Sequence, residues 1–179
     1  MHLHLLPLLG VLDGNGTAYK LLLLGHIFCV IVGIGSTFVY PFFGIEASKR
    51  KGVAAAAMNE TAYKTAKIIT TPLIYGAGIF GLLLVALGPI DWSDVWVQAS
   101  LTLYVIAILF AAFVHVPNLS KMVDLGNELA GMGAPPAGAS GPPAQALEME
   151  RRGKDAGRNG GILHLLITAI IVLMVFKPR

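Results

Sequence analysis

The sequence predicts an all-α integral membrane protein, a four-helix bundle. Three observations predict this class: a low content of charged residues, a high content of hydrophobic ones and four apolar runs of membrane length. Of the 179 residues, 55% are hydrophobic and 13% are charged, and the mean hydropathy is +0.72. Because soluble domains carry about 25% charged residues, this composition excludes a soluble enzyme, a secreted disulfide scaffold and a disordered regulator.

The four apolar runs are predicted to be transmembrane helices. They lie at about residues 21–43, 68–87, 95–116 and 162–176. A helix crosses a hydrocarbon core of about 30 Å with about 20 residues, and the last run is the shortest of the four. No run alternates with period two, which disfavours a barrel, and backbone groups in hydrocarbon must be satisfied internally, which favours helices.

Lysine and arginine residues are distributed unevenly between the loops. Ten of the 13 lie in residues 44–67 and 118–161, whereas the loop between the second and third runs has none. By the positive-inside rule, both long loops are cytoplasmic and both termini face outward. Trp92 and Trp96 fit this N-out, C-out topology, since they flank the predicted outer end of the third helix.

The segments between the apolar runs have different characters, and together with the runs they form one domain over residues 1–179. We expect residues 3–12 to be an interfacial lead-in rather than a cleaved signal peptide, because a basic region and a cleavage site are lacking. Residues 118–130 keep helical spacing and extend the third helix. Residues 131–145, rich in proline, glycine and alanine, predict a flexible cytoplasmic linker before the last helix. Residues 146–152 are expected to form one or two helical turns.

Three prolines accompany the apolar runs. We expect Pro72 in the first turns of the second helix, where a missing N–H is tolerated, and Pro41 and Pro117 near helix ends.

Small residues form two groups within the runs. Gly25, Cys29 and Gly33 recur at intervals of four in the first run, a pattern that lets another helix approach closely, within the chain or from another copy. Packing within the chain is favoured, because four helices must close on something. The sulfur of Cys29 is expected to pack rather than to react.

The second run contains a literal GxGxxG motif in Gly76, Gly78 and Gly81. The motif binds dinucleotides only where it joins a strand to a helix. Inside an apolar span the amides are already used by the helix, so we interpret these glycines as packing residues.

Three histidines fall within the predicted spans, and ionisable groups there are functional hypotheses by default. His115 and His164 lie near the cytoplasmic ends of their helices and can share one site, whereas His26 lies closer to the outer boundary. Two histidines from facing helices are the minimum for bis-imidazole ligation of a haem, so haem b is a possible cofactor. The alternative, which we favour, is that these histidines hydrogen-bond to headgroups, water or neighbouring helices. A metal ion would need further ligands, and no nearby Cys, Asp or Glu within the span supplies them.

The first three helices resemble a family of bacterial predicted integral membrane proteins of unknown function. The resemblance covers about residues 20–132 and rests on five features. They are the first helix LLLLGHIFCVIVGIGSTFVYPFF, the loop SKRK, the second helix TTPLIYGAGIFGLLL, the tryptophan pair, and AAFVHVPNLSKM at the end of the third helix.

More distantly, HIFCVIVGIGSTFVYP (residues 26–41) is similar to the opening of the membrane-bound protoporphyrinogen oxidase of bacterial haem synthesis and to the copper-resistance membrane domain. In those groups the early histidine is a candidate ligand of haem or metal. The resemblance implies that role for His26.

Two functions remain open at this stage. The first is an accessory or structural subunit of a bacterial plasma membrane assembly or homo-oligomer, without enzymatic activity. The alternative is a haem-b-binding redox protein or oxidase that uses His26 or the His115/His164 pair. A proton-driven transporter has the least support, because the spans contain no acidic residue. The lipid bilayer is an expected partner and nucleic acid is not.

Overall fold

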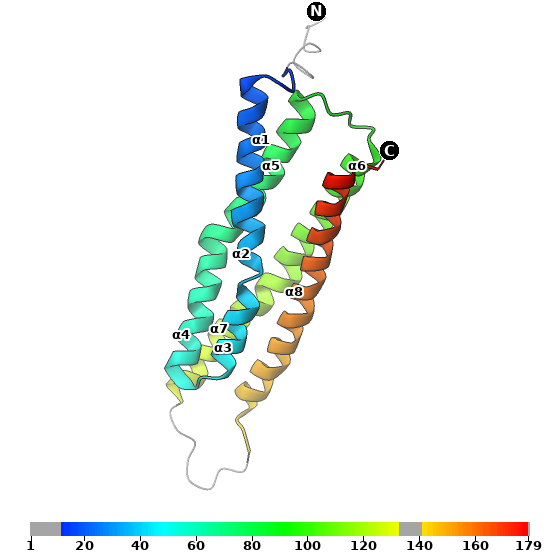
Figure 1. The fold of residues 1–179 in the computed structure, drawn as a ribbon. Coiled ribbons are helices and arrows are strands. Elements are labelled where there is room, and N and C mark those ends of the chain that lie inside the picture. Colours follow the sequence, from blue (N-terminus) through cyan, green and yellow to red (C-terminus); the bar gives the residue numbers. More distant parts are fainter. Residues whose placement is uncertain (1–11, 133–140, 179) are drawn as a thin grey trace, which may run out of the picture. The chain divides into compact units, whose positions relative to one another are not determined.

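A computed structural model describes residues 12–132 and 141–178, and within them every regular element is a helix (Figure 1). Four helices are long and apolar enough to cross a membrane, and they are Thr17–Ser48, Gly52–Leu87, Val95–Gly131 and Ala144–Phe176. This confirms the predicted class, an all-α membrane protein with four spanning helices.

The long helices are divided into shorter elements by π-helical turns and by one break. The first contains α1 (Thr17–Cys29), η2 (Val30–Ile34), α2 (Gly35–Thr37) and α3 (Tyr40–Ser48). The second contains α4 (Gly52–Thr65), η3 (Ala66–Thr70) and α5 (Thr71–Leu87). The third contains α6 (Val95–Phe110), η4 (Ala111–His115) and α7 (Val116–Gly131), and the fourth is α8 (Ala144–Phe176).

The long helices exceed the spans that hydropathy predicts. They have 32 to 37 residues, or about 48–56 Å at 1.5 Å per residue, against a hydrocarbon core of about 30 Å. The largest difference is in α8. The last span was predicted to begin at about residue 162 and residues 146–152 to form one or two turns, but one continuous helix begins at Ala144. The expectation of only one or two turns at residues 146–152 was wrong, whereas residue 162 stays the predicted start of the last span.

The ends of the predicted linker, residues 131–145, are also helical. Gly131 ends α7, and Ala144 begins α8. Residues 133–140 lie outside the described residues, as does most of the predicted lead-in at residues 3–12.

Pro72 and Pro117 lie at the first positions of α5 and α7, as expected, but each of these elements continues a longer helix without a break. A proline ring clashes with the carbonyl of the residue four positions earlier, which is Ile68 for Pro72 and Phe113 for Pro117. Both carbonyls lie in π-helical turns, η3 and η4. The wider turn re-pairs the backbone with a shift of one residue, so each helix passes its proline without ending.

The described chain divides into two compact units, and every long helix contributes to both. Unit 1 comprises residues 12–37, 68–105 and 167–178, and unit 2 comprises residues 38–67, 106–132 and 141–166. In unit 1 the closest packing is between α1 and α5. In unit 2, α4 packs against α3 and α7.

Small residues bring α1 and η2 against α5. A Cβ added to Gly33 would lie 3.0 Å from the Leu73 Cβ, and one added to Gly76 would lie 3.0 Å from the Cys29 Sγ. A Cβ on Gly25 would lie 2.9 Å from the Phe80 ring. The small residues of the first run therefore face the second long helix of the same chain.

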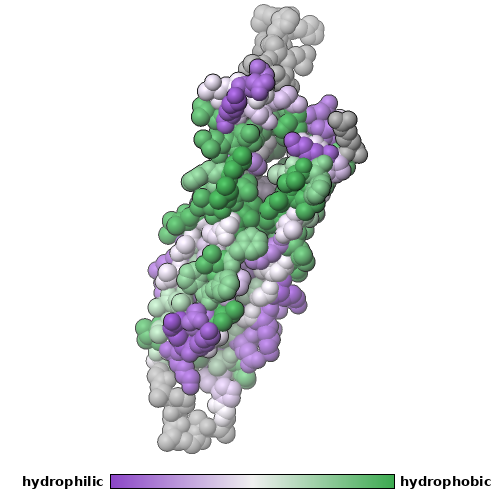
Figure 2. Space-filling model, viewed as in Figure 1, coloured by the Kyte–Doolittle hydropathy of each residue, from purple (hydrophilic) through white to green (hydrophobic). Residues whose placement is uncertain are grey.

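The buried core is small and made mostly of small side chains. Its apolar members among the described residues are Cys29, Ala47, Ala56, Ala77, Leu84, Val97, Ala107 and Ile170. Large apolar side chains lie instead on the surface. Figure 2 shows them over α1 and the C-terminal half of α8, whereas hydrophilic residues gather over the N-terminal half of α8 and the end of α3. Such an apolar surface suits contact with lipid.

The close approach at Gly33 generates a stability prediction. Gly33→Ala places a methyl group against backbone as well as side chain, since its Cβ would lie 3.1 Å from the Ile74 nitrogen. We expect a loss of about 1–3 kcal/mol of unfolding free energy, the usual cost of overpacking. Gly35→Ala is the matched control, because no atom lies within 4 Å of its added Cβ. Denaturation of both variants in mild detergent, followed by circular dichroism, measures the difference. Equal midpoints for the two variants would contradict the packing assignment.

Candidate functional site

His26 lies on α1 and its imidazole faces α5. The His26 Nδ1 is 2.9 Å from the carbonyl oxygen of Ala77. Because a carbonyl only accepts, Nδ1 carries the proton and donates, and in the neutral ring Nε2 carries the lone pair. Gly81 leaves space for the ring, since a Cβ there would lie 3.3 Å from the His26 Cε1.

Two further polar links join the second long helix to its neighbours in unit 1. The Tyr104 hydroxyl donates to the carbonyl of Ile74 at 3.1 Å. The Ser36 hydroxyl donates to the Gly33 carbonyl at 2.9 Å, and its oxygen is 2.7 Å from the Thr70 hydroxyl. Either hydroxyl can be the donor in the pair of Ser36 and Thr70.

The glycines of the GxGxxG motif lie in the interior of α5. A Cβ on Gly78 would overlap the Tyr104 hydroxyl, just as one on Gly81 would crowd His26. The motif therefore stands where two polar side chains reach the carbonyls of α5, and it does not join a strand to a helix.

His115 and His164 come together in unit 2. His115 ends η4, His164 lies on α8, and the two side chains are close enough to interact electrostatically. The His164 ring stacks on Phe38 with centroids 4.4 Å apart and planes 7° apart. Gly160 faces His115, with its added Cβ 3.9 Å from the imidazole Cε1. Within the described chain, the buried Nδ1 of His115 has no hydrogen-bond partner.

The three histidines do not form one site in a single unit. His26 belongs to unit 1, whereas His115 and His164 belong to unit 2. In residues 12–132 and 141–178, no group of three or more His, Cys, Asp or Glu side chains is placed to hold a metal ion.

One polar contact in unit 2 has no counterpart in the sequence reasoning. The Asn118 Nδ2 donates to the Arg152 carbonyl at 3.0 Å, and the Arg152 Nη1 donates to the Asn118 Oδ1 at 3.1 Å. The Arg152 Nε also lies 2.8 Å from a carboxylate oxygen of Glu148. Asn118 is only 8% exposed. The sequence shows the i,i+4 spacing of Glu148 and Arg152. It carries no signal that pairs Arg152 with Asn118.

Four long apolar helices, joined by polar side chains that bond to helix carbonyls, define a multi-pass α-helical integral membrane protein. The family model described as predicted integral membrane protein (DUF2269) matches residues 20–178. The chain belongs to this family, as the resemblance of its first three helices suggested. No curated protein and no solved structure matches the chain. The more distant likeness to the protoporphyrinogen oxidase and copper-resistance groups remains an expectation.

Proposed function

We propose that the chain is a structural or accessory subunit, without enzymatic activity, of a membrane assembly or homo-oligomer in the bacterial plasma membrane. The observation that carries the proposal is the engagement of the polar side chains of unit 1. His26 and Tyr104 each donate to a carbonyl of α5. Polar groups bonded in this way hold helices in register, which is the task of a scaffold.

The orientation of the subunit follows from the charge of its loops. Ten of the 13 lysines and arginines lie in two loops, and we assign both loops to the cytoplasm. An epitope inserted at residue 136 is then expected to be protected in intact cells and labelled only after the membrane is permeabilised. An epitope inserted at residue 92 is the control with the opposite expectation. Labelling of the residue 136 epitope in intact cells would reverse the proposed topology.

The fourth long helix offers the surface for assembly. The closest helix pairs in each unit do not include α8. In unit 2, α8 carries the exposed side chains of Ile162 (39%) and Leu165 (73%), three residues apart on one face of the helix. We propose that this apolar face packs against a second copy or another membrane subunit.

Cysteine cross-linking in native membranes tests the assembly. Leu165→Cys in a Cys29→Ser background is expected to form an adduct of defined mass. Ile31→Cys, at a position of similar exposure (65%) on the first long helix, is expected to stay monomeric. Mass measurement of the particle extracted in mild detergent identifies the species. Two results together would contradict the subunit proposal: no cross-linked adduct of Leu165→Cys, and a monomer without a stoichiometric partner in detergent.

Haem b binding at His115 and His164 is the second candidate function. The observation that favours it is the buried Nδ1 of His115, which lacks a protein partner in the described chain beside a second imidazole. Two imidazoles from different helices suit bis-histidine ligation. Phe38 stacks on the face of the His164 ring, and the ring nitrogens lie at its edge, so the stacking does not oppose ligation. His26, whose Nε2 carries the lone pair, is the alternative ligand.

The absorption spectrum of the purified protein tests this candidate. A haem protein is expected to show a Soret band that His115→Ala and His164→Ala each remove, while His26→Ala retains it. Loss of the band only in His26→Ala would move the ligand to unit 1. A colourless preparation with full helical content, made with haem supplied during expression, would exclude the haem function and leave the subunit proposal standing.

A further inference from the structure

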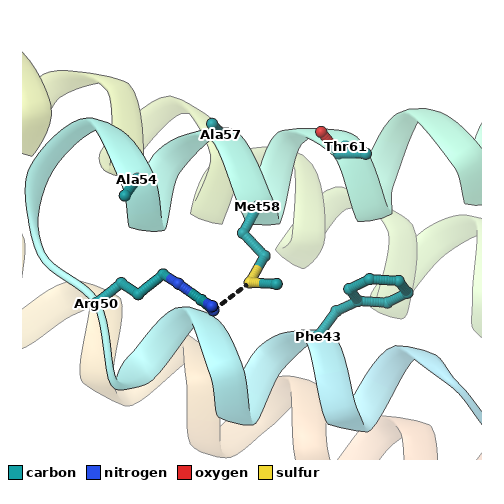
Figure 3. Close-up of a pocket in the computed structure, with 6 residues that line it drawn as sticks. All are labelled: Phe43, Arg50, Ala54, Ala57, Met58 and Thr61. Carbon is teal, nitrogen blue, oxygen red and sulfur yellow. Dashed lines mark hydrogen bonds between the residues drawn. The ribbon is translucent and has the colours of Figure 1, made fainter.

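The hairpin of α3 and α4 in unit 2 carries an open groove with a cavity volume of about 370 Å³. Its lining residues are Phe43, Arg50, Ala54, Ala57, Met58 and Thr61. Figure 3 shows Met58 and Phe43 directed into the space between the two helices, with Arg50 reaching in from the connecting loop. The groove is therefore apolar along its length and cationic at one end.

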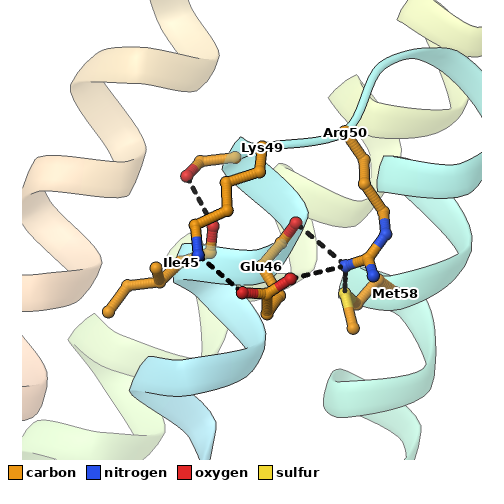
Figure 4. A network of polar contacts seen from close by, with 6 residues as sticks. Ile45, Glu46, Lys49, Arg50 and Met58 are labelled. Carbon is orange, nitrogen blue, oxygen red and sulfur yellow. Dashed lines mark hydrogen bonds and ion pairs between the residues drawn. The ribbon is translucent and has the colours of Figure 1, made fainter.

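The cationic end is a basic cluster, which we define as Lys49, Arg50 and Lys51 around the single carboxylate of Glu46. One Glu46 oxygen is 2.7 Å from the Lys49 Nζ, and the other is 3.3 Å from the Arg50 Nη1 (Figure 4). Two of the three cations pair with this carboxylate, and the basic cluster carries a net charge of +2. Its own acidic residue does not neutralise it.

Arg50 keeps donors for an additional anion. The Arg50 Nη1 donates to the Glu46 carbonyl and carboxylate and to the Met58 sulfur, the last at 3.0 Å. A guanidinium has five N–H donors, and among the described residues its Nη2 and Nε donate to none. The Arg50 side chain is 43% exposed. A phosphate group suits such a half-engaged guanidinium, which can bind it with two donors.

The groove lies where the first long helix leaves its apolar stretch. The predicted span ends at Phe43, and Arg50 follows seven residues later, a rise of about 10 Å along a helix. The headgroup layer adds about 5–8 Å to each side of the hydrocarbon core. The Arg50 side chain folds back to Glu46, which lies three residues after the end of the predicted first span, and this brings the guanidinium toward the headgroup layer.

We propose that the α3–α4 groove and the basic cluster form a binding site for one anionic glycerophospholipid. The phosphate contacts Arg50 and Lys49, and the glycerol and upper acyl chain lie against Phe43 and Met58. Zwitterionic lipids lack the net charge that complements the basic cluster. Each lysine or arginine near an anionic surface contributes about a fivefold gain in binding.

Native mass spectrometry with defined lipids tests the site. The purified protein is exchanged into detergent that contains dioleoyl phosphatidylglycerol or dioleoyl phosphatidylcholine. One phosphatidylglycerol is expected to remain bound in clear preference to phosphatidylcholine. The variant Lys49→Gln/Arg50→Gln is expected to lower the affinity for phosphatidylglycerol about 20-fold or more, because two charges are removed. Thermal unfolding of each variant in detergent verifies that it is folded.

Two further variants separate this site from general attraction of lipid to a basic protein. Lys121→Gln is the matched charge control, because Lys121 and Lys49 have the same side-chain exposure, 63%, and each pairs with an acidic residue three positions away. It is expected to bind as wild type. Ala57→Trp leaves the basic cluster intact but fills the groove, and it is expected to lose the lipid.

Several outcomes would overturn the proposal. They are equal binding of the two lipids, an equal effect of Lys121→Gln and the double variant, and unchanged binding in folded Ala57→Trp. Binding of free glycerol phosphate as tightly as the lipid would point to a soluble anion instead.

Discussion

The whole structure depends on the requirement that backbone N–H and C=O groups be satisfied inside hydrocarbon, where each unpaired group costs several kcal/mol. The two prolines inside the long helices show how the chain meets this requirement. Pro72 and Pro117 each remove a donor within a long helix, yet the chain stays helical through η3 and η4. Side chains obey the same rule: His26 and Tyr104 donate to the second lone pair of carbonyls that α5 already uses.

Helix association in lipid lacks the hydrophobic driving force of a soluble core, so close packing and interhelical hydrogen bonds replace it. Both occur along the same seam of unit 1. Gly33 allows η2 to approach α5, and one turn later the Ser36 and Thr70 hydroxyls are hydrogen-bonded. An intramembrane hydrogen bond of this kind contributes about 0.6–2 kcal/mol. The glycine contact sets the distance between the helices, and the polar links set their register.

Hydropathy predicted the four spans but not where the helices end. Hydropathy measures the preference of a segment for lipid. The polar half of α8 is helical for another reason, because successive ion pairs at i,i+3 and i,i+4 stabilise the helix there. Examples are the pairs Glu150–Lys154 and Asp155–Arg158. Depth along the helices predicted that His26 lies apart from the other two histidines, and the structure places His26 in unit 1 and the other two in unit 2. Depth did not identify Ala77 as the partner of His26, because that depends on the rotation of α5, and no periodic feature of the sequence encodes it.

Both ligand proposals rest on polar atoms of unit 2 that protein groups leave open to a ligand. In unit 1, His26, Tyr104 and Ser36 meet protein partners. In unit 2, the described contacts leave the Nδ1 of His115 and two donor nitrogens of Arg50 unsatisfied by protein. The Nδ1 of His115 is buried, so a ligand can recover the free energy that its missing partner costs. Arg50 is 43% exposed, and its remaining donors are open to an anion from solvent. Unit 1 also holds such a group, because the buried Ser100 Oγ has no partner among the described residues. The proposed recognition in unit 2 therefore rests on the basic cluster and on the second imidazole beside His115, and not on unsatisfied atoms alone.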